Sequence, residues 1–192
     1  MSYLLLLGEP GVGKCRLLEK LINDFENVIW ITTVYSFEKV RERIGDKAWI
    51  VDVFSWGMKE VKSEKDLIVA NPTNMNEISL AVSKVLQKIK KDYLLILNSI
   101  SGLSVYQPLS KVMNLLRVLL MKIEGDKAKA VFTLVTGAQD RQFEIGTMML
   151  FPCIVELLDR EVRVLKSFSS EIDKGDYNVE RAKEILSKLL SS

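Results

Sequence analysis

Eight residues near the amino terminus constrain the fold of this chain more than any other stretch. They stand between an apolar run, residues 3–7, and a helical pattern, and they read Gly8-Glu9-Pro10-Gly11-Val12-Gly13-Lys14-Cys15. The spacing is that of a phosphate-binding P-loop, G-x-x-x-x-G-K-[S/T], in the strand–loop–helix context that such a loop needs. Glycines let several backbone N–H groups point at one anion, and the positive end of the following helix adds to that field. Lys14 is expected to reach the outer phosphates.

The last position of the motif departs from the usual pattern. Cys15 stands where Ser or Thr offers a hydroxyl to Mg²⁺. Mg²⁺ is a hard ion that prefers oxygen, and a thiol is a poor substitute. We therefore expect an anion site with Mg²⁺ doubtful and no metal ligand, formed by Gly8, Glu9, Pro10, Gly11, Val12, Gly13, Lys14, Cys15 and Arg16. The alternative is a glycine-rich turn without a ligand.

The composition excludes several classes of protein. Hydrophobic residues make up 48% of the 192 residues, which is enough for the core of one domain. The net charge of +2 gives no bulk field for nucleic acid, and the absence of histidine removes the commonest general base and metal ligand. Two cysteines form no disulfide framework, and no apolar stretch is long enough to cross a membrane. We expect a cytoplasmic protein without a signal peptide.

The hydrophobic pattern alternates between strands and helices along the chain. We expect strands at residues 3–7, 28–33, 48–53, 67–70, 93–97, 130–135, 153–158 and 162–168. Helices are expected after the P-loop and at residues 36–44, 74–89, 109–123 and 178–190, with a loop over 54–66 and a polar break at 169–178. Such alternation predicts an α/β fold with a mostly parallel sheet, helices on both faces and a late antiparallel strand pair. The expected division is a domain at 1–170, followed at 171–192 by a linker and an amphipathic helix.

Hydrolysis of a nucleotide also needs an acidic residue at the end of a buried strand, to hold Mg²⁺ through water. The strand at residues 93–97 is followed by Asn98, whose amide carries no charge. Two interpretations stay open: Asn98 contacts a water at the site, or it caps the turn at residues 99–101.

Several segments together resemble one family. The P-loop, Leu97-Asn98-Ser99-Ile100-Ser101-Gly102-Leu103, and the late strands ending in Ile154-Val155-Glu156-Leu157 and Arg163-Val164-Leu165-Lys166 resemble the RecA-like ATPases of the KaiC, GvpD and archaeal recombinase-paralogue group. Residues 48–56 resemble the third strand of that group, and the likeness covers about residues 3–170. It implies a RecA-type core, ATP as the ligand, and self-association or pairing with a related RecA-like subunit, with the nucleotide near the subunit boundary.

The same resemblance exposes four departures at the positions that carry chemistry. Cys15 replaces the hydroxyl, and Asn98 replaces the metal-holding Asp. Val34-Tyr35 follows the second strand where the group has acidic residues, and Phe168 replaces the arginine of a late Lys-x-Arg that begins at Lys166. Four such losses in a chain that keeps its hydrophobic pattern indicate lost catalysis, so we expect no catalytic residue and leave enzymatic activity open.

These observations favour a protein that binds ATP or ADP with little or no hydrolysis and acts as a regulatory or scaffold subunit. A slow ATPase is the first alternative. A DNA-recombination mediator ranks third, because binding to the DNA backbone needs several cations. Residues 99–107 contain no Lys or Arg, and residues 137–149 contain only Arg141. A protein or peptide partner could dock on the C-terminal helix or on the apolar segment 143–151, and packing of each on the chain's own core is the alternative.

Overall fold

A computed structural model describes residues 3–56, 63–89 and 92–191, and one sheet organises them. Within these residues nine strands pair in the order β4-β3-β2-β5-β6-β1-β7-β8-β9. Their bounds are β1 (Tyr3–Gly8), β2 (Val28–Thr32), β3 (Trp49–Asp52), β4 (Asp66–Ile68), β5 (Leu94–Asn98), β6 (Lys129–Val135), β7 (Cys153–Leu157), β8 (Glu161–Lys166) and β9 (Gly175–Asn178). Strands β1 to β7 pair in parallel, and β8 and β9 add antiparallel, as the α/β pattern with a late antiparallel pair predicts.

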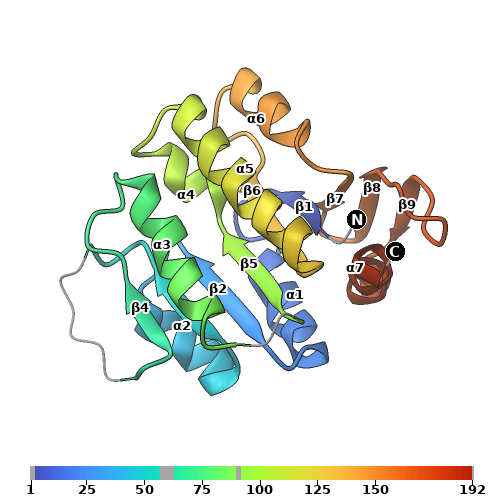
Figure 1. Cartoon of the computed structure of the whole chain (residues 1–192). Helices are drawn as coiled ribbons and strands as arrows, with labels where there is room; N and C mark the ends of the chain where they lie inside the picture. Colours follow the sequence, from blue (N-terminus) through green and yellow to red (C-terminus); the bar gives the residue numbers. More distant parts are fainter. Residues whose placement is uncertain (1–2, 57–62, 90–91, 192) are drawn as a thin grey trace.

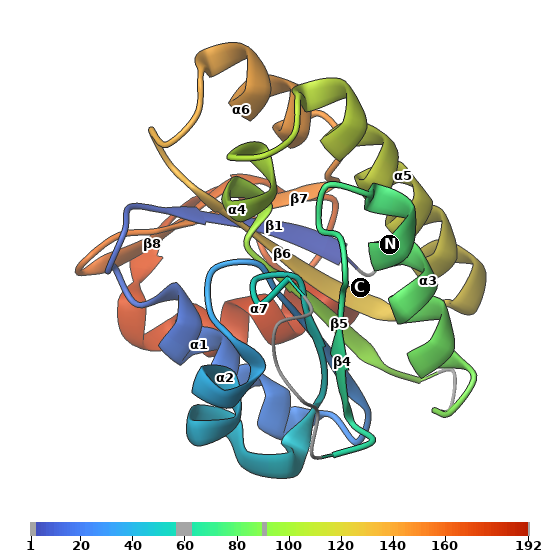
Figure 2. The same cartoon turned by 90° about the vertical axis from the view of Figure 1, so that its left-hand side faces the viewer.

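Helices cover both faces of the sheet (Figures 1 and 2). They are α1 (Lys14–Leu21), α2 (Phe37–Ile44), α3 (Met75–Leu86), α4 (Ile100–Ser104), α5 (Leu109–Asp126), α6 (Arg141–Met148) and α7 (Ala182–Ser191), with short 3₁₀ turns at Ile22–Asp24, Gly45–Lys47 and Val179–Arg181. Helices α1, α2 and α7 pack on one face, and α3 to α6 pack on the other (Figure 2). The C-terminal helix α7 lies beside α1.

The central strand β1 shows why this sequence forms a two-sided sheet. Leu4 and Leu6 pack in the core under α1 and α7, whereas Leu5 and Leu7 pack in the opposite core under α5. Each of these four side chains is at most 5% exposed. Burying one such side chain contributes roughly 1.5–3 kcal/mol, so an uninterrupted apolar run is stable only where helices cover both faces.

The structure contains three elements that the pattern does not indicate. Helices α4 and α6 are short, and β9 lies inside the segment expected as a polar break. Strand β9 is an edge strand joined to β8 through backbone pairing, such as Val162 opposite Tyr177, so it needs no apolar stripe. Part of the expected loop over 54–66, residues 57–62, lies outside the described residues.

The C-terminal helix α7 packs on its own chain. Ile185, Leu186, Leu189 and Leu190 are each at most 1% exposed and belong to the core that α1 also covers. The apolar segment 143–151 is divided, because Phe143 and Phe151 are buried while Ile145 and Met149 are 47% and 76% exposed. In the described part of the chain, no helix combines the length and the hydropathy needed to cross a membrane.

Candidate functional site

A cleft of about 520 Å³ opens at the carboxyl ends of β1, β2, β5 and β6. Its walls are formed by Pro10, Gly11, Val12, Gly13, Lys14, Cys15, Arg16, Val34, Tyr35, Arg43, Asn98, Ser99 and Val135. Seven of the nine predicted site residues therefore line it, and the other two, Gly8 and Glu9, contact Lys14 through their carbonyl groups. The volume is in the range of small-molecule sites, and the carboxyl edge of a parallel sheet is where such sites occur.

The glycines of the loop are required by the backbone. Gly11 and Gly13 have φ angles of 81° and 106°, which side-chain-bearing residues rarely adopt, and Gly13 is the N-cap of α1. A Cβ atom at Gly8 would lie 2.8 Å from the Leu157 carbonyl oxygen and 2.9 Å from Val12 Cγ1. The loop conformation expected for phosphate binding thus depends on these three positions.

Lys14 lies folded over its own loop. Its Nζ donates to the carbonyl oxygens of Gly8, at 2.5 Å, and Glu9, at 2.7 Å, and the residue is 8% exposed. Burial lowers the pKa of the Lys14 ammonium, since desolvation disfavours the charged form. An anion in the loop would supply the negative charge that the two neutral carbonyls lack.

Cys15, Asn98 and Thr133 form a chain of hydrogen bonds beneath the loop. Asn98 Nδ2 donates to Cys15 Sγ at 3.3 Å, and Thr133 Oγ1 donates to Asn98 Oδ1 at 3.0 Å. The capping interpretation of Asn98 is wrong, because Ser99 is the N-cap of α4 and the Asn98 amide points to Cys15. Sequence reasoning missed Thr133, although a single hydroxyl in the apolar β6 strand was the available signal.

This donor set does not fit Mg²⁺. The two positions that would hold the ion carry a sulfur and an amide whose oxygen already accepts a hydrogen bond from Thr133. Hard divalent ions prefer carboxylate, hydroxyl and water oxygens. Among the described residues, no cluster of three or more Asp, Glu, Cys or His side chains could hold a metal ion.

Positive side chains surround the cleft instead. Lys14, Arg16 and Arg43 line it, and no carboxylate of the described residues does. Arg43, at the C-terminal end of α2, was not predicted, and its Nε lies 2.7 Å from Glu19 Oε1. The charges of this wall suit an anion.

The other two departures from the family pattern, at Val34-Tyr35 and at Phe168, lie in different parts of the structure. Val34 and Tyr35 line the cleft at the end of β2, where Thr32 Oγ1 donates to the Tyr35 carbonyl at 2.8 Å. Phe168 is 73% exposed and does not line the cleft. Lys166, two residues earlier, donates from Nζ to the Phe151 carbonyl oxygen at 2.7 Å, so it stabilises the β8 end of the chain's own fold.

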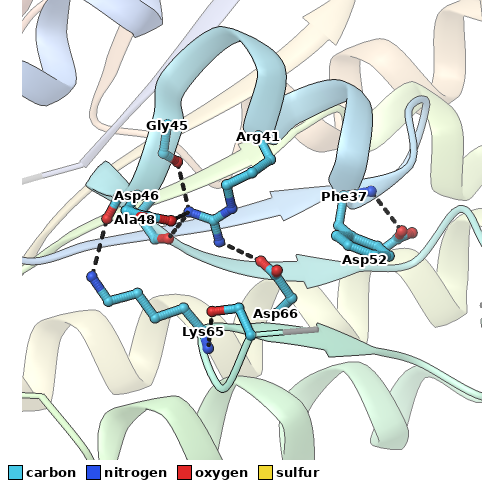
Figure 3. A network of polar contacts seen from close by, with 9 residues as sticks. Phe37, Arg41, Gly45, Asp46, Ala48, Asp52, Lys65 and Asp66 are labelled. Carbon is cyan, nitrogen blue, oxygen red and sulfur yellow. Dashed lines mark hydrogen bonds and ion pairs between the residues drawn. The ribbon is translucent and has the colours of Figure 1, made fainter. Parts of the chain in front are cut away.

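A second polar cluster lies on the other side of α2, and its charges are paired (Figure 3). The Arg41 guanidinium contacts the Asp66 carboxylate and donates to the carbonyls of Gly45 and Ala48 at 2.6 and 3.1 Å. Asp52 is fully buried and accepts from the backbone N–H of Phe37 at 2.7 Å. This cluster ties α2 to β3 and β4 and leaves its carboxylates satisfied.

A P-loop between a central β1 and α1, in a parallel sheet with a late antiparallel pair, defines a RecA-like P-loop fold, and solved structures share it. A KaiC-like protein of Pyrococcus horikoshii OT3 matches with 14% identity and a TM-score of 0.57, over 92% of this chain and 84% of that chain. An uncharacterised P. horikoshii protein, solved with an unknown peptide, matches with 14% identity and a TM-score of 0.64, over 86% and 84%. A type III secretion ATPase of pathogenic bacteria matches with 13% identity and a TM-score of 0.56, over 82% of this chain and 51% of that chain.

The fold resemblance that the motifs indicate is therefore confirmed. No protein-family model matches the chain, and no curated protein matches it. At identities of 13–14% the likeness is one of architecture.

Proposed function

We propose that this chain is a RecA-like protein that binds ATP or ADP in the cleft with little or no hydrolysis, and acts as a regulatory or scaffold subunit. One observation carries the proposal: the phosphate-binding half of the site is complete, and the metal and water-activating half is replaced. The first half is the glycine loop with Lys14, which lines a cleft of about 520 Å³. The second half is represented by Cys15, Asn98 and Tyr35.

The two halves differ in what they contribute to each activity. Loop N–H groups, the N-terminus of α1 and Lys14 bind phosphate without needing a metal. Loss of a general base alone typically lowers a rate by about 10²–10⁴. Binding is therefore expected to survive the replacements at Cys15 and Asn98, whereas turnover is not.

The first test is calorimetry of ATP and ADP binding, with hydrolysis of radiolabelled ATP measured on the same preparations. We expect wild-type protein to bind, Lys14→Ala to lose about tenfold or more of the affinity, and both to hydrolyse ATP at the same background rate. Lys20→Ala is the matched control, because Lys20 is an exposed lysine of α1 that does not line the cleft. Equal binding by wild type and Lys14→Ala, or no binding by either, contradicts the proposal. Turnover above that of Lys14→Ala favours the slow ATPase instead.

The subunit role is supported by exposed apolar side chains outside the cleft. Ile145 and Met149 of the α6 region and Phe168 after β8 expose 47%, 76% and 73% of their surface. We propose that a second copy of the chain or a related RecA-like subunit covers them. Light scattering with and without ATP tests the first of these partners: wild type should associate and Met149→Glu should be monomeric, and a wild-type monomer in both conditions contradicts self-association.

A further inference from the structure

Among the described residues, Arg43 is the one cation of the cleft wall that comes from outside the loop and α1. It lies in the last turn of α2, and its side chain lines the same cleft as Lys14, Cys15 and Asn98. No local motif marks it, and the proposed function does not assign it a role. Its side chain is 40% exposed, so it can reach a bound molecule without leaving the wall.

Arg43 forms an ion pair with Glu19 through one nitrogen. Arg43 Nε lies 2.7 Å from Glu19 Oε1, and this is the only ion pair that Arg43 makes within residues 3–56, 63–89 and 92–191. No hydrogen bond from its two terminal nitrogens to another described residue occurs. Those terminal nitrogens form the planar fork that binds two phosphate oxygens at once.

Glu19 pairs with Arg43 from α1, the helix that also carries Cys15. Glu19 is four residues after Cys15 on α1, so the two side chains lie on the same face of that helix. Its own side chain is 23% exposed, and it does not line the cleft. Glu19 instead lines a smaller adjoining pocket together with Cys15, Arg43 and Asn98, so its carboxylate pairs with Arg43 beside the cleft.

The charges of the wall are those of a site that needs no divalent cation. A nucleoside polyphosphate carries several negative charges, and in most P-loop sites Mg²⁺ offsets part of them. Here the metal position holds Cys15 Sγ and the Asn98 amide, while Lys14, Arg16 and Arg43 supply positive charge. A fixed guanidinium can offset phosphate charge in the way that arginine does at other phosphate sites.

We propose that Arg43 replaces the divalent metal of this site, so that the cleft binds the metal-free form of a nucleoside polyphosphate, with Glu19 as a positioning residue. The inference rests on the proposed function, because it concerns the ligand of the same cleft. It goes further by naming the chemical form of that ligand and the residue that selects it. Mg²⁺ then competes with the protein for the nucleotide phosphates.

The test is ATP binding by calorimetry in two buffers, one with EDTA and one with excess MgCl₂. Wild-type protein should bind at least as tightly in EDTA as in Mg²⁺. Arg43→Gln should lose about tenfold or more in EDTA, and Arg43→Lys should recover part of that loss, because it restores the charge without the fork. Glu19→Gln should lose less than Arg43→Gln, since it keeps the guanidinium and removes only its positioning.

Arg160→Gln is the matched control, because it removes the same charge from an exposed arginine between β7 and β8 that does not line the cleft. It should leave both affinities unchanged. Should Arg43→Gln fail to fold, as thermal melting would show, Arg43→Lys and Glu19→Gln still decide whether the guanidinium and its orientation affect affinity.

Three results separate the failure of this inference from the failure of the proposed function. Binding that needs Lys14 but tightens tenfold or more with Mg²⁺ overturns the role of Arg43 as a metal replacement. Binding that needs Lys14 and is unchanged in Arg43→Gln overturns it as well, and both leave nucleotide binding intact. No binding of wild type in either buffer overturns the proposed function together with this inference.

Discussion

Arg41 and Arg43 lie two residues apart on α2 and occupy opposite kinds of surroundings. The Arg41 side chain is 18% exposed and contacts the carboxylates of Asp66 and Asp46 and two backbone carbonyls. The Arg43 side chain is 40% exposed, has one carboxylate partner, Glu19, and lines the cleft. The terminal nitrogens of Arg41 are bonded within the fold, although its buried Nε has no hydrogen-bond partner, whereas the terminal nitrogens of Arg43 donate to no described residue. Helix α2 thus separates a buried cation with several partners from a partly exposed cation that lines the cleft.

The same contrast holds for the acidic residues on the two sides of α2. Asp52 and Asp66, in the cluster of Figure 3, are 0% and 6% exposed and have hydrogen-bond partners. The cleft wall has no carboxylate among its described residues. Carboxylates balance the charge of Arg41, whereas the wall that Lys14, Arg16 and Arg43 line holds an excess of positive charge that suits an anion.

The largest effect is expected from breaking the paired cluster. Asp66→Ala leaves the largely buried Arg41 guanidinium without its closest carboxylate, which we expect to lower the free energy of unfolding by about 3–5 kcal/mol in urea denaturation. Asp46→Ala, at a partner that is 86% exposed and 3.5 Å away, is the matched control and should cost less than about 1 kcal/mol. Equal losses in the two variants would show that the Arg41 cluster is not a buried network.

A second prediction concerns a double variant that introduces metal ligands into the cleft. The double variant Cys15→Ser, Asn98→Asp restores a hydroxyl and a carboxylate at the positions where sulfur and amide now meet. We expect ATP binding by this variant to tighten about tenfold on addition of Mg²⁺, which corresponds to about 1.4 kcal/mol. Wild type and Asn98→Gln are the controls and should show no such gain. Absence of a Mg²⁺ effect in the double variant would place the metal determinants elsewhere in the cleft.

A third prediction compares the two arginines directly. Arg43→Gln should lower the free energy of unfolding by no more than about 1 kcal/mol, because its pair with Glu19 is partly exposed and screened by solvent. Arg41→Gln should cost several times more, since it leaves two carboxylates and two carbonyls without their donor. Urea denaturation of the two variants measures the two losses in the free energy of unfolding, and so their ratio. A comparable loss in both would mean that Arg43 is as structural as Arg41.

The smallest effect concerns pH. Burial lowers the pKa of Lys14 below its ordinary value of 10.5, and a bound phosphate would raise it again. At a pH between the pKa of Lys14 in the empty protein and its pKa in the complex, ATP binding is accompanied by uptake of a proton. ATP affinity should therefore fall as pH rises through the alkaline range. Calorimetry in two buffers of different ionisation enthalpy measures the uptake, and Lys14→Ala should show none. The folding stability of the empty protein depends on pH in the opposite direction. The free-energy cost of burying the Lys14 charge is present at neutral pH, and stability rises as pH passes through the lowered pKa of Lys14.

The parts of this structure that the sequence predicts are those with a local cause. The glycine spacing and the apolar run at residues 3–7 define β1, the loop and the start of α1 within one short stretch. Asn98 was predicted at the end of its strand, but not its contact with Cys15, which joins residues 83 positions apart. Helix α6 did carry a local signal that was not used, because the Asp140 side chain caps it by accepting from the Phe143 N–H at 2.8 Å.

Other features depend on packing alone. Arg43 reaches the cleft because α2 packs beside α1 and Glu19 holds its Nε, and neither fact leaves a mark in the sequence around residue 43. Strand β9 forms on the edge strand β8 through backbone pairing of residues 175–178, supported by the Arg163–Asp176 ion pair, and such pairing leaves no hydrophobic pattern in the sequence. The fold was therefore predictable from periodicity and one motif, and the place of Arg43 in the cleft wall was not.

The position of β1 has a consequence for the order in which the sheet folds. Its neighbours in the described sheet are β6 and β7, so β1, which ends at Gly8, pairs with strands that begin at Lys129 and beyond. Contacts between such distant segments close late in folding. The P-loop, which directly follows β1, is thus among the last parts of the fold to be fixed in place.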